Sequence, residues 1–446
     1  MCMIRMRRLP FIGLGLVGLV VGFSKCVRSG AAGSGDPRGG AYAGMGACLG
    51  CHKGIGDPYL HAAHAMTSRV AGLHTVDGPF TSPGNEFVYG PGRKVSMQRR
   101  DSGLFQVAVT PFGQEAHRFD IVVGSGRKAQ TYLYWKGDGA FQLPVSYFLT
   151  EHSWANSPHY PVDSIWFGRA VDVGCFECHA SYITKKGMIH VDAFHGTPQY
   201  DRASIVYGID CERCHGPGAL HVAWQTAHKE DTAGRYIARF AALSRQQKLD
   251  VCAQCHSGGH ASALRSIFYF KPGDTLANFV FADPRMTASP QQTDVHGNQY
   301  ELLVASKCFM KSATLECGSC HDPHVRERDN MTGFARRCMS CHGTGGLMEE
   351  HASLGEACSQ GPGRVKIVFD GVKIERGRAN MDTGFLVKNC IDCHMPAKAS
   401  EAITMLTAQQ RDPVADLVRT HLIAIYPQVS KQLLAGQWVG RSHRDR

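Results

Sequence analysis

The sequence predicts a mainly α-helical and irregular fold with one small antiparallel β insertion and a core supplied largely by bound groups. Three observations predict this fold class. A short cysteine–histidine motif occurs seven times, six of the copies crowd between residues 175 and 394, and a motif-free stretch at 80–150 holds short β-prone runs. With 43% apolar and 19% charged residues, the 446-residue chain has a globular rather than a disordered composition.

The first 26 residues have the layout of a secretory leader. Arg5, Arg7 and Arg8 precede an apolar run at 9–23, and small polar residues follow. We expect a signal peptide or a lipoprotein leader at 1–26, with Cys26 as the residue that a lipid would modify. The protein would then be exported to the periplasm or the cell exterior, and any peripheral membrane contact would run through its N-terminus. An uncleaved N-terminal anchor is the alternative, and the Gly-rich stretch 27–46 is expected to be a flexible linker.

The repeated motif is Cys-x-x-Cys-His, the attachment sequence of c-type haem. Two thiols at this spacing reach the two vinyl groups of one porphyrin, and the adjacent histidine is then held beneath the iron. Zinc sites pair two Cys-x-x-Cys units without requiring the histidine, and a redox motif would occur once. We therefore predict seven covalently attached haem c groups. The attachment residues are Cys48, Cys51, Cys175, Cys178, Cys211, Cys214, Cys252, Cys255, Cys317, Cys320, Cys338, Cys341, Cys390 and Cys393, and the proximal ligands are His52, His179, His215, His256, His321, His342 and His394.

The density of motifs predicts the domain organisation. Six motifs between 175 and 394 leave little room for a conventional side-chain core, so the porphyrins themselves must supply much of it in a multihaem cytochrome fold. The chain without haem should be largely unfolded, because metal binding and folding are coupled. We expect a first haem segment at 47–75, a β-rich insertion at 76–155, a six-haem domain at 156–400 and a C-terminal helical segment at 401–446.

Histidines outside the motifs are candidates for the second axial ligand of each iron, since electron-transfer haems usually carry two strong ligands. His221 follows a Gly-Pro-Gly turn that aims it at a haem other than its own, and His324 follows Pro323 in a similar way. His64 is expected on a helix, where His61 shares its face. The candidate distal ligands are His64, His159, His221, His324, His351 and His421, the last on an apolar segment at 414–426 with helical spacing.

The motif-free stretch is expected to form a small antiparallel meander. Its β-prone runs lie at 86–90, 94–100, 104–110, 118–126 and 129–135. Covering haems is its expected role, and partner docking or an active-site wall is the alternative. No cluster of acid, base and nucleophile stands out, so no catalytic residue is assigned. Beyond the leader, Cys308 and Cys358 remain outside the motifs, and they would be able to pair in an oxidising compartment.

The net charge of +10 does not indicate a nucleic-acid partner. Residues 1–25 hold four basic side chains and no acidic one, so the rest of the chain carries +6. Its basic residues are scattered and form no cluster with interleaved aromatics, as on an ordinary solvated surface. Redox proteins are the expected partners, and the oligomeric state is not predicted.

Several stretches of sequence resemble a known group of exported multihaem cytochromes. The stretches are HAMTSR (64–69), GIDCERCHGPGALH (208–221), LSRQQKLDVCAQCH (243–256), KPGDTLANF (271–279), SKCFMKSATLECGSCHDPH (306–324) and NCIDCHMP (389–396). The group is related to the tetrahaem electron acceptor of ammonia oxidisers and includes hydroxylamine oxidoreductase and pentahaem nitrite reductase. The most similar members are haem domains often fused to tetratricopeptide repeats.

This resemblance covers 48–396 and the His421 segment. It implies bis-histidine haems in edge-sharing and stacked pairs, mostly helical connections, and His64, His221, His324 and His421 as distal ligands. No Cys-x-x-Cys-Lys motif occurs, so the lysine-ligated catalytic haem of the nitrite reductases is absent.

The leading functional hypothesis is a seven-haem protein that transfers single electrons outside the cytoplasm. The alternative is an oxidoreductase that acts on a small nitrogen or sulfur compound at one open-site haem. A third hypothesis is a haem-bearing scaffold whose β insertion binds partners.

Overall fold

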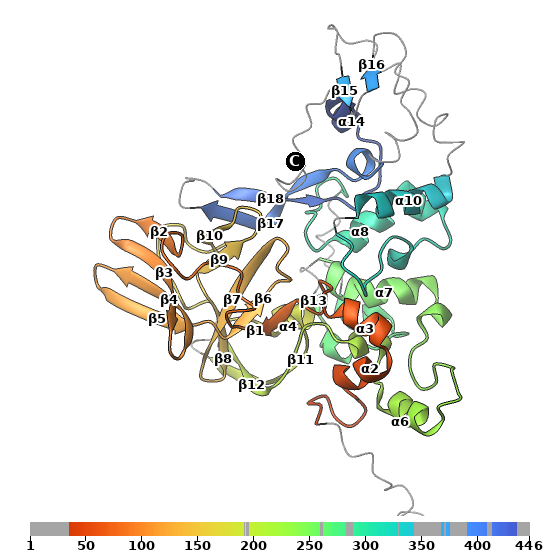
Figure 1. Ribbon diagram of the computed structural model, residues 1–446, viewed down its shortest axis with the longest axis horizontal. Coiled ribbons are helices and arrows are strands. Elements are labelled where there is room, and N and C mark those ends of the chain that lie inside the picture. Colours follow the sequence, from red (N-terminus) through yellow and green to blue (C-terminus); the bar gives the residue numbers. More distant parts are fainter. Residues whose placement is uncertain are drawn as a thin grey trace, which may run out of the picture.

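A computed structural model describes residues 35–190, 192, 196–258, 262–281, 289–328, 330–342, 367–369, 372–374, 390–407 and 413–434. Figure 1 shows a strand-rich part beside a part built from short helices and irregular segments. The first motif and the C-terminal motif both lie in the helical part, so the chain leaves it for the strands and then returns.

A four-stranded antiparallel meander occupies one side of the strand-rich part. Its strands are β2 (Glu86–Gly90), β3 (Arg93–Arg100), β4 (Gly103–Thr110) and β5 (Gly113–Arg118), paired in sequence order. The turns between them hold Gly92, Gly103 and Gly113, all with positive φ, which is the conformation that glycine tolerates best. The predicted runs at 86–90, 94–100 and 104–110 are therefore strands, as expected.

A larger antiparallel sheet faces the meander and gathers strands from distant parts of the chain. Its order is β1-β6-β7-β9-β10-β17-β18, with β8 also paired to β7. The bounds are β1 Ser68–Val70, β6 Ile121–Val123, β7 Ala129–Lys136, β8 Gly139–Gln142, β9 Val145–Phe148, β10 Ser153–Asn156, β17 Ala397–Thr407 and β18 Val414–Arg419.

An apolar core fills the space between these two sheets. Val95 and Met97 of β3 are fully buried and belong to the same cluster as Tyr132 of β7 and Trp154 of β10. Burial of each such side chain stabilises the fold by about 1.5–3 kcal/mol. The buried Gln106 amide bridges the sheets, because its Nε2 donates to the Val145 carbonyl at 2.6 Å and its Oε1 accepts from the Val145 amide at 3.2 Å.

The second part of the chain is made of short helices, one long hairpin and smaller strand pairs. The hairpin pairs β11 (Ala180–His190) with β12 (Gly196–Tyr207). The helices are α2 Met45–Cys51, α3 Lys53–Tyr59, α4 Val173–His179, α5 Cys211–His215, α6 Ala219–Ala227, α7 Arg245–His256, α8 Gln299–Val304, α9 Lys307–Lys311, α10 Met331–His342 and α14 Pro427–Leu434, and the 3-10 turns are η1 Phe240–Ala242, η2 Ile267–Tyr269, η3 Leu276–Asn278 and η5 Cys317–Ser319. The smaller strand pairs are β13 Ser262–Ala263 with β14 Val280–Phe281 and β15 Ile367–Phe369 with β16 Val372–Ile374. None of the described helices is long and apolar enough to cross a bilayer.

The predicted fold class, mainly α with a small β insertion, is wrong. About 28% of the structure is helix and about 29% is strand, and the strands form several antiparallel sheets. Strands continue beyond the insertion: β11 starts directly after the second motif, and β17 starts three residues after the end of the seventh. A stretch next to a motif is thus not necessarily helical.

Two local helix predictions also fail. The apolar residues around 414–426 form strand β18 followed by irregular chain, so His421 lies just after a strand. In β18 Asp416 is buried, Ala415 is half-buried and Leu417 is exposed, and the β-branched Val414 and Val418 favour a strand. His64 lies in a turn beyond the end of α3 rather than on a helix.

Candidate haem sites

Each of the seven motifs lies on a single turn of helix or at its end. Side chains at positions i, i+3 and i+4 share one face of a helix, so the two thiols and the imidazole of a motif point to the same side. At four of these helices the side chain of the N-cap residue accepts a hydrogen bond from a backbone amide of the first turn. Asp172 caps α4, Asp210 caps α5, Ser244 caps α7 and Glu316 caps η5.

The motif faces open onto one connected cavity of about 3240 Å³. Every motif contributes to its lining, although Cys175 and Cys341 do not. A pocket for one drug-sized ligand has about 300–1,000 Å³, so this cavity has room for several large groups. The second motif is anchored from the strand side, since Phe176 packs with Ile121 and Tyr200 in an apolar cluster.

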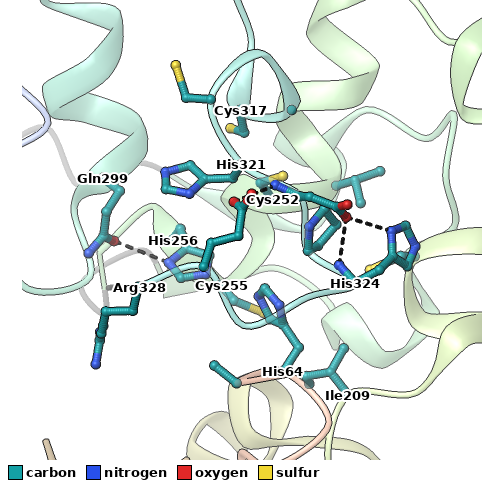
Figure 2. Close-up of a pocket in the computed structure, with 18 of the residues that line it drawn as sticks. His64, Ile209, Cys252, Cys255, His256, Gln299, Cys317, His321, His324 and Arg328 are labelled. Carbon is teal, nitrogen blue, oxygen red and sulfur yellow. Dashed lines mark hydrogen bonds and ion pairs between the residues drawn. The ribbon is translucent and has the colours of Figure 1, made fainter. Parts of the chain in front are cut away.

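Four proximal histidines face a second imidazole across the cavity. Two imidazoles bound to opposite sides of one iron, each with a metal–nitrogen bond of about 2.0 Å, have ring centroids about 6 Å apart. The four pairs match this spacing: His52–His221 at 6.3 Å, His64–His256 at 6.2 Å, His215–His324 at 6.1 Å and His321–His421 at 6.2 Å. Figure 2 shows His64, His256 and His321 gathered in one part of the cavity.

In every pair the second imidazole comes from a segment that follows a different motif. His221 follows the third motif and faces the histidine of the first, while His324 follows the fifth and faces the histidine of the third. His64 follows the first motif and faces the histidine of the fourth. Four of the six predicted distal residues are thus brought to axial spacing, each beside another motif than its nearest.

Hydrogen bonds orient several of these rings. The Nδ1 atoms of His221 and His394 donate to the carbonyls of Arg235 at 2.8 Å and Ala424 at 2.9 Å. Since a carbonyl can only accept, Nδ1 carries the proton and Nε2 keeps its lone pair for a metal. Figure 2 shows the comparable contact of His256 Nδ1 with Gln299 Oε1 at 3.2 Å.

The His64 loop is fixed against the third motif. Its carbonyl accepts from the Ile209 amide at 2.9 Å, and the Gly208 amide donates to Ser68 Oγ at 3.0 Å. A Cβ at Gly208, where φ is +66°, would lie 2.2 Å from the Ala65 carbonyl oxygen, so only glycine fits this approach.

Burial keeps the imidazoles neutral. Desolvation lowers the pKa of His64, His179 and His421 to about 4, with smaller effects from neighbouring histidines. Neutral imidazole is the form that ligates a metal. Among the described residues, the buried Nδ1 atoms of His179 and His421 have no hydrogen-bond partner, so these two rings lack the orienting contact that His221 and His394 have. The residues present therefore fit haem.

Thiols of different motifs also lie together. Cys48 is within hydrogen-bonding reach of Cys211, Cys178 of Cys255, and Cys252 of Cys317. Cys338 lies near enough to Cys320 to raise the pKa of that thiol, and Cys390 has the same effect on Cys338, after the larger effect of burial in both cases. Neighbouring motifs are thus close enough for their haems to be neighbours.

A buried ion cluster holds the first motif beside the third. Arg38, with its side chain 4% exposed, contacts Asp36 at 2.9 Å, Asp210 at 2.6 Å and Glu212 at 2.9 Å. Glu212, inside the third motif, also accepts from the amides of Ala43 and Gly44, just before α2. No sequence pattern indicates this cluster, since Asp210 and Glu212 lie 172 and 174 positions from Arg38.

The remaining candidates have different outcomes. His159 lines the cavity but is exposed, and its ring contacts no motif histidine among the described residues. His351, Cys358, Cys26 and the predicted leader fall outside the described residues. Cys308 is half-buried and lines the cavity. His296 also lines the cavity, and no sequence motif predicted it.

Comparison with known proteins gives limited similarity. No family model matches the chain. The multiheme cytochrome MtrA of Shewanella baltica is 26% identical over 195 residues, which is 41% of this chain and 56% of that protein. The chain thus spans about half the length of the curated relative that it matches. The outer cell wall cytochrome OcwA aligns over 88% of this chain and 82% of its own, with 16% identity and a TM-score of 0.49.

The similarity to MtrA, taken with the seven motifs, supports a multihaem c-type cytochrome with covalently bound haem c. The narrower superfamily suggested by the sequence stays a prediction.

Proposed function

We propose that this protein is a seven-haem c-type cytochrome that passes single electrons between redox partner proteins outside the cytoplasm. One observation carries the proposal: all seven motifs open on one cavity, and four proximal histidines face a second imidazole at 6.1–6.3 Å. Two strong axial ligands minimise rearrangement when an iron changes oxidation state, which suits electron transfer better than substrate binding.

The haem iron supplies a one-electron redox couple, and the chain supplies position and surroundings. The motif cysteines would anchor each group, and the motif histidines would bind its iron. Imidazoles such as His221 and His324 would supply a second ligand and keep small molecules away from the iron. The apolar cavity wall and the hydrogen bonds to Nδ1 would set the reduction potentials.

The thiol contacts support an order for the haems, numbered 1 to 7 by their motifs. Haem 1 would neighbour haem 3 through Cys48 and Cys211. Haem 3 would neighbour haem 4 because Cys214 and Cys255 pack against the same apolar cluster. Haem 4 would continue to haems 5, 6 and 7 through the contacts described above. Haem 2 would branch from haem 4 through the contact of Cys178 with Cys255.

The location outside the cytoplasm rests on the predicted leader at 1–26 and on the maturation of c-type haem. Membrane attachment would run through the N-terminus or Cys26. The competing hypothesis, an oxidoreductase acting on a small nitrogen or sulfur compound, requires a haem with an open axial position.

Spectroscopy of the purified holoprotein tests the proposal. Electron paramagnetic resonance of the oxidised protein should show low-spin signals from haems 1, 3, 4 and 5. Nitrite and hydroxylamine should leave the visible spectrum unchanged. A predominantly high-spin signal, or a stoichiometric spectral change with nitrite, would favour the enzyme instead.

A further inference from the structure

Arg213 is a buried arginine inside the third motif, between Cys211 and Cys214. The residue is 5% exposed and lines the cavity. Among the described residues its guanidinium forms no ion pair, and its buried Nε has no hydrogen-bond partner. A buried charge without a counter-charge is costly to the fold, so its presence calls for a functional reason. We propose that Arg213 is a fixed positive charge that raises the reduction potentials of haems 2, 3 and 4.

The carboxylates nearest to Arg213 in the sequence bind another cation. Asp210 and Glu212 contact the guanidinium of Arg38 at 2.6 Å and 2.9 Å. Asp210 also accepts from the backbone amide of Arg213 at 3.1 Å, because Asp210 caps α5. The positive charge of the Arg213 side chain is therefore not neutralised by direct contact with either acid.

Arg213 lies where three motifs meet. Its Nη2 donates to the carbonyl of Glu177, inside the second motif, at 3.0 Å. The Sγ atom of Cys255, in the fourth motif, lies 3.9 Å from the same carbonyl oxygen. Cys178, Cys214 and Cys255 pack against one apolar cluster and line the cavity. In the haem order proposed above, this is the point where haem 2 branches from haem 4 next to haem 3.

The guanidinium is held in place from several sides. Besides the Glu177 carbonyl, the Ile267 carbonyl accepts a hydrogen bond from Nη1 of Arg213. The Cζ atom lies 5.4 Å from the ring centroid of Phe268, which is buried in the same apolar cluster as Phe176 of the second motif. Because arginine does not lose its proton in proteins, this arrangement keeps one positive charge at a fixed place.

A fixed positive charge favours the reduced form of a nearby haem. Reduction takes one electron from a redox partner or a neighbouring haem and converts Fe(III) to Fe(II), which lowers the charge of the group by one. The interaction of that charge with the guanidinium is stronger in a cavity without water, where the dielectric constant is low. Haems 2, 3 and 4 would thus be reduced before the others. This inference rests on the proposed function, because it requires bound haems.

The test is a potentiometric titration of the full-length holoprotein at pH 6. Arg213→Met removes the charge but keeps an apolar side chain of similar length, which buried sites tolerate. At least one midpoint should fall by about 59 mV or more, a tenfold change in the equilibrium constant for one-electron reduction. Arg213→Lys keeps the charge but loses the planar guanidinium, so its midpoints should stay close to those of the wild type. An arginine that only joins the two carbonyls would give equal shifts in both variants.

Arg69 provides the matched control. Its Nε is also buried without a hydrogen-bond partner among the described residues, and its Nη2 donates to the Gly124 carbonyl at 3.3 Å. Arg69 does not line the cavity, so Arg69→Met should leave all midpoints unchanged. An equal fall of the midpoints in Arg69→Met and Arg213→Met would overturn the proposal, because the effect would then not depend on the place of the charge.

Unchanged midpoints in Arg213→Met would also overturn the proposal, as would equal shifts in Arg213→Met and Arg213→Lys. If neither variant accumulates, nuclear magnetic resonance of the partly reduced wild-type protein decides. The first haem to be reduced should be haem 2, 3 or 4, and first reduction at any other haem would overturn the proposal. In all these cases the proposed function stands if the wild-type protein contains mainly low-spin haems, whereas a mainly high-spin wild-type protein would contradict the proposed function itself.

Discussion

Removal of the His221 imidazole tests whether this residue is the second axial ligand of a haem iron. The ring stands 6.3 Å from His52, with 14° between the two planes, and its Nδ1 donates to the Arg235 carbonyl at 2.8 Å. In His221→Ala, one iron of seven loses its second ligand and becomes high-spin, and its potential shifts. Loss of one hydrogen bond costs about 1 kcal/mol, so the fold should survive.

The assay is a potentiometric titration followed by visible and electron paramagnetic resonance spectra, with the mass of the denatured protein measured in parallel. Attachment at Cys211 and Cys214 should persist, so the haem count should not change. His228→Ala is a close control, because His228 caps the end of the same helix α6 but stacks on Trp224 at 3.8 Å. Seven low-spin haems with wild-type potentials in His221→Ala would refute the reasoning and make the turn merely structural.

Three further predictions concern stability and charge. Arg38→Met leaves Asp210 and Glu212 buried without their cation, so it should lower the free energy of unfolding by about 3–5 kcal/mol. Lys94→Ala, at an exposed ion pair, is the control and should change the denaturant midpoint little. Equal midpoints for the two variants would contradict this. Burial raises the pKa of Glu301 to about 7 from its usual 4.5, so the free energy of unfolding should fall as pH rises across that window. Glu301→Gln should flatten this fall. A variant with an unchanged pH profile of stability would show that Glu301 does not cause it. Each ferric bis-histidine haem adds roughly one negative charge with its propionates, so the isoelectric point of the holoprotein should lie near neutral pH. Isoelectric focusing of the holoprotein above about pH 8.5 would contradict this charge count.

The motif residues were predictable because their chemistry is local. Two thiols and an imidazole within five positions bind one porphyrin wherever the chain goes, so no knowledge of the fold was needed. The turn before His221 was predictable for the same reason, since Gly-Pro-Gly restricts the backbone locally. His221 does lie opposite an imidazole of another motif, although its ligation stays a prediction.

The strands outside the insertion and the surroundings of Arg213 depended on long-range contacts. Residues 414–419 alternate weakly and also fit helical spacing, so only pairing with β17 makes them a strand. The motif does not specify Arg213, whose burial becomes evident only when the carbonyls of Glu177 and Ile267 meet its guanidinium. The Arg38 cluster likewise joins positions that nothing in the sequence connects.

Intact mass spectrometry of the denatured holoprotein tests the central claim most directly. Covalent attachment at all seven motifs predicts an increment of roughly 4.3 kDa over the polypeptide, whose start is fixed by N-terminal sequencing in the same sample. The same spectrum would reveal lipid on Cys26. An increment that matches six haems or fewer would contradict a fully occupied seven-haem protein.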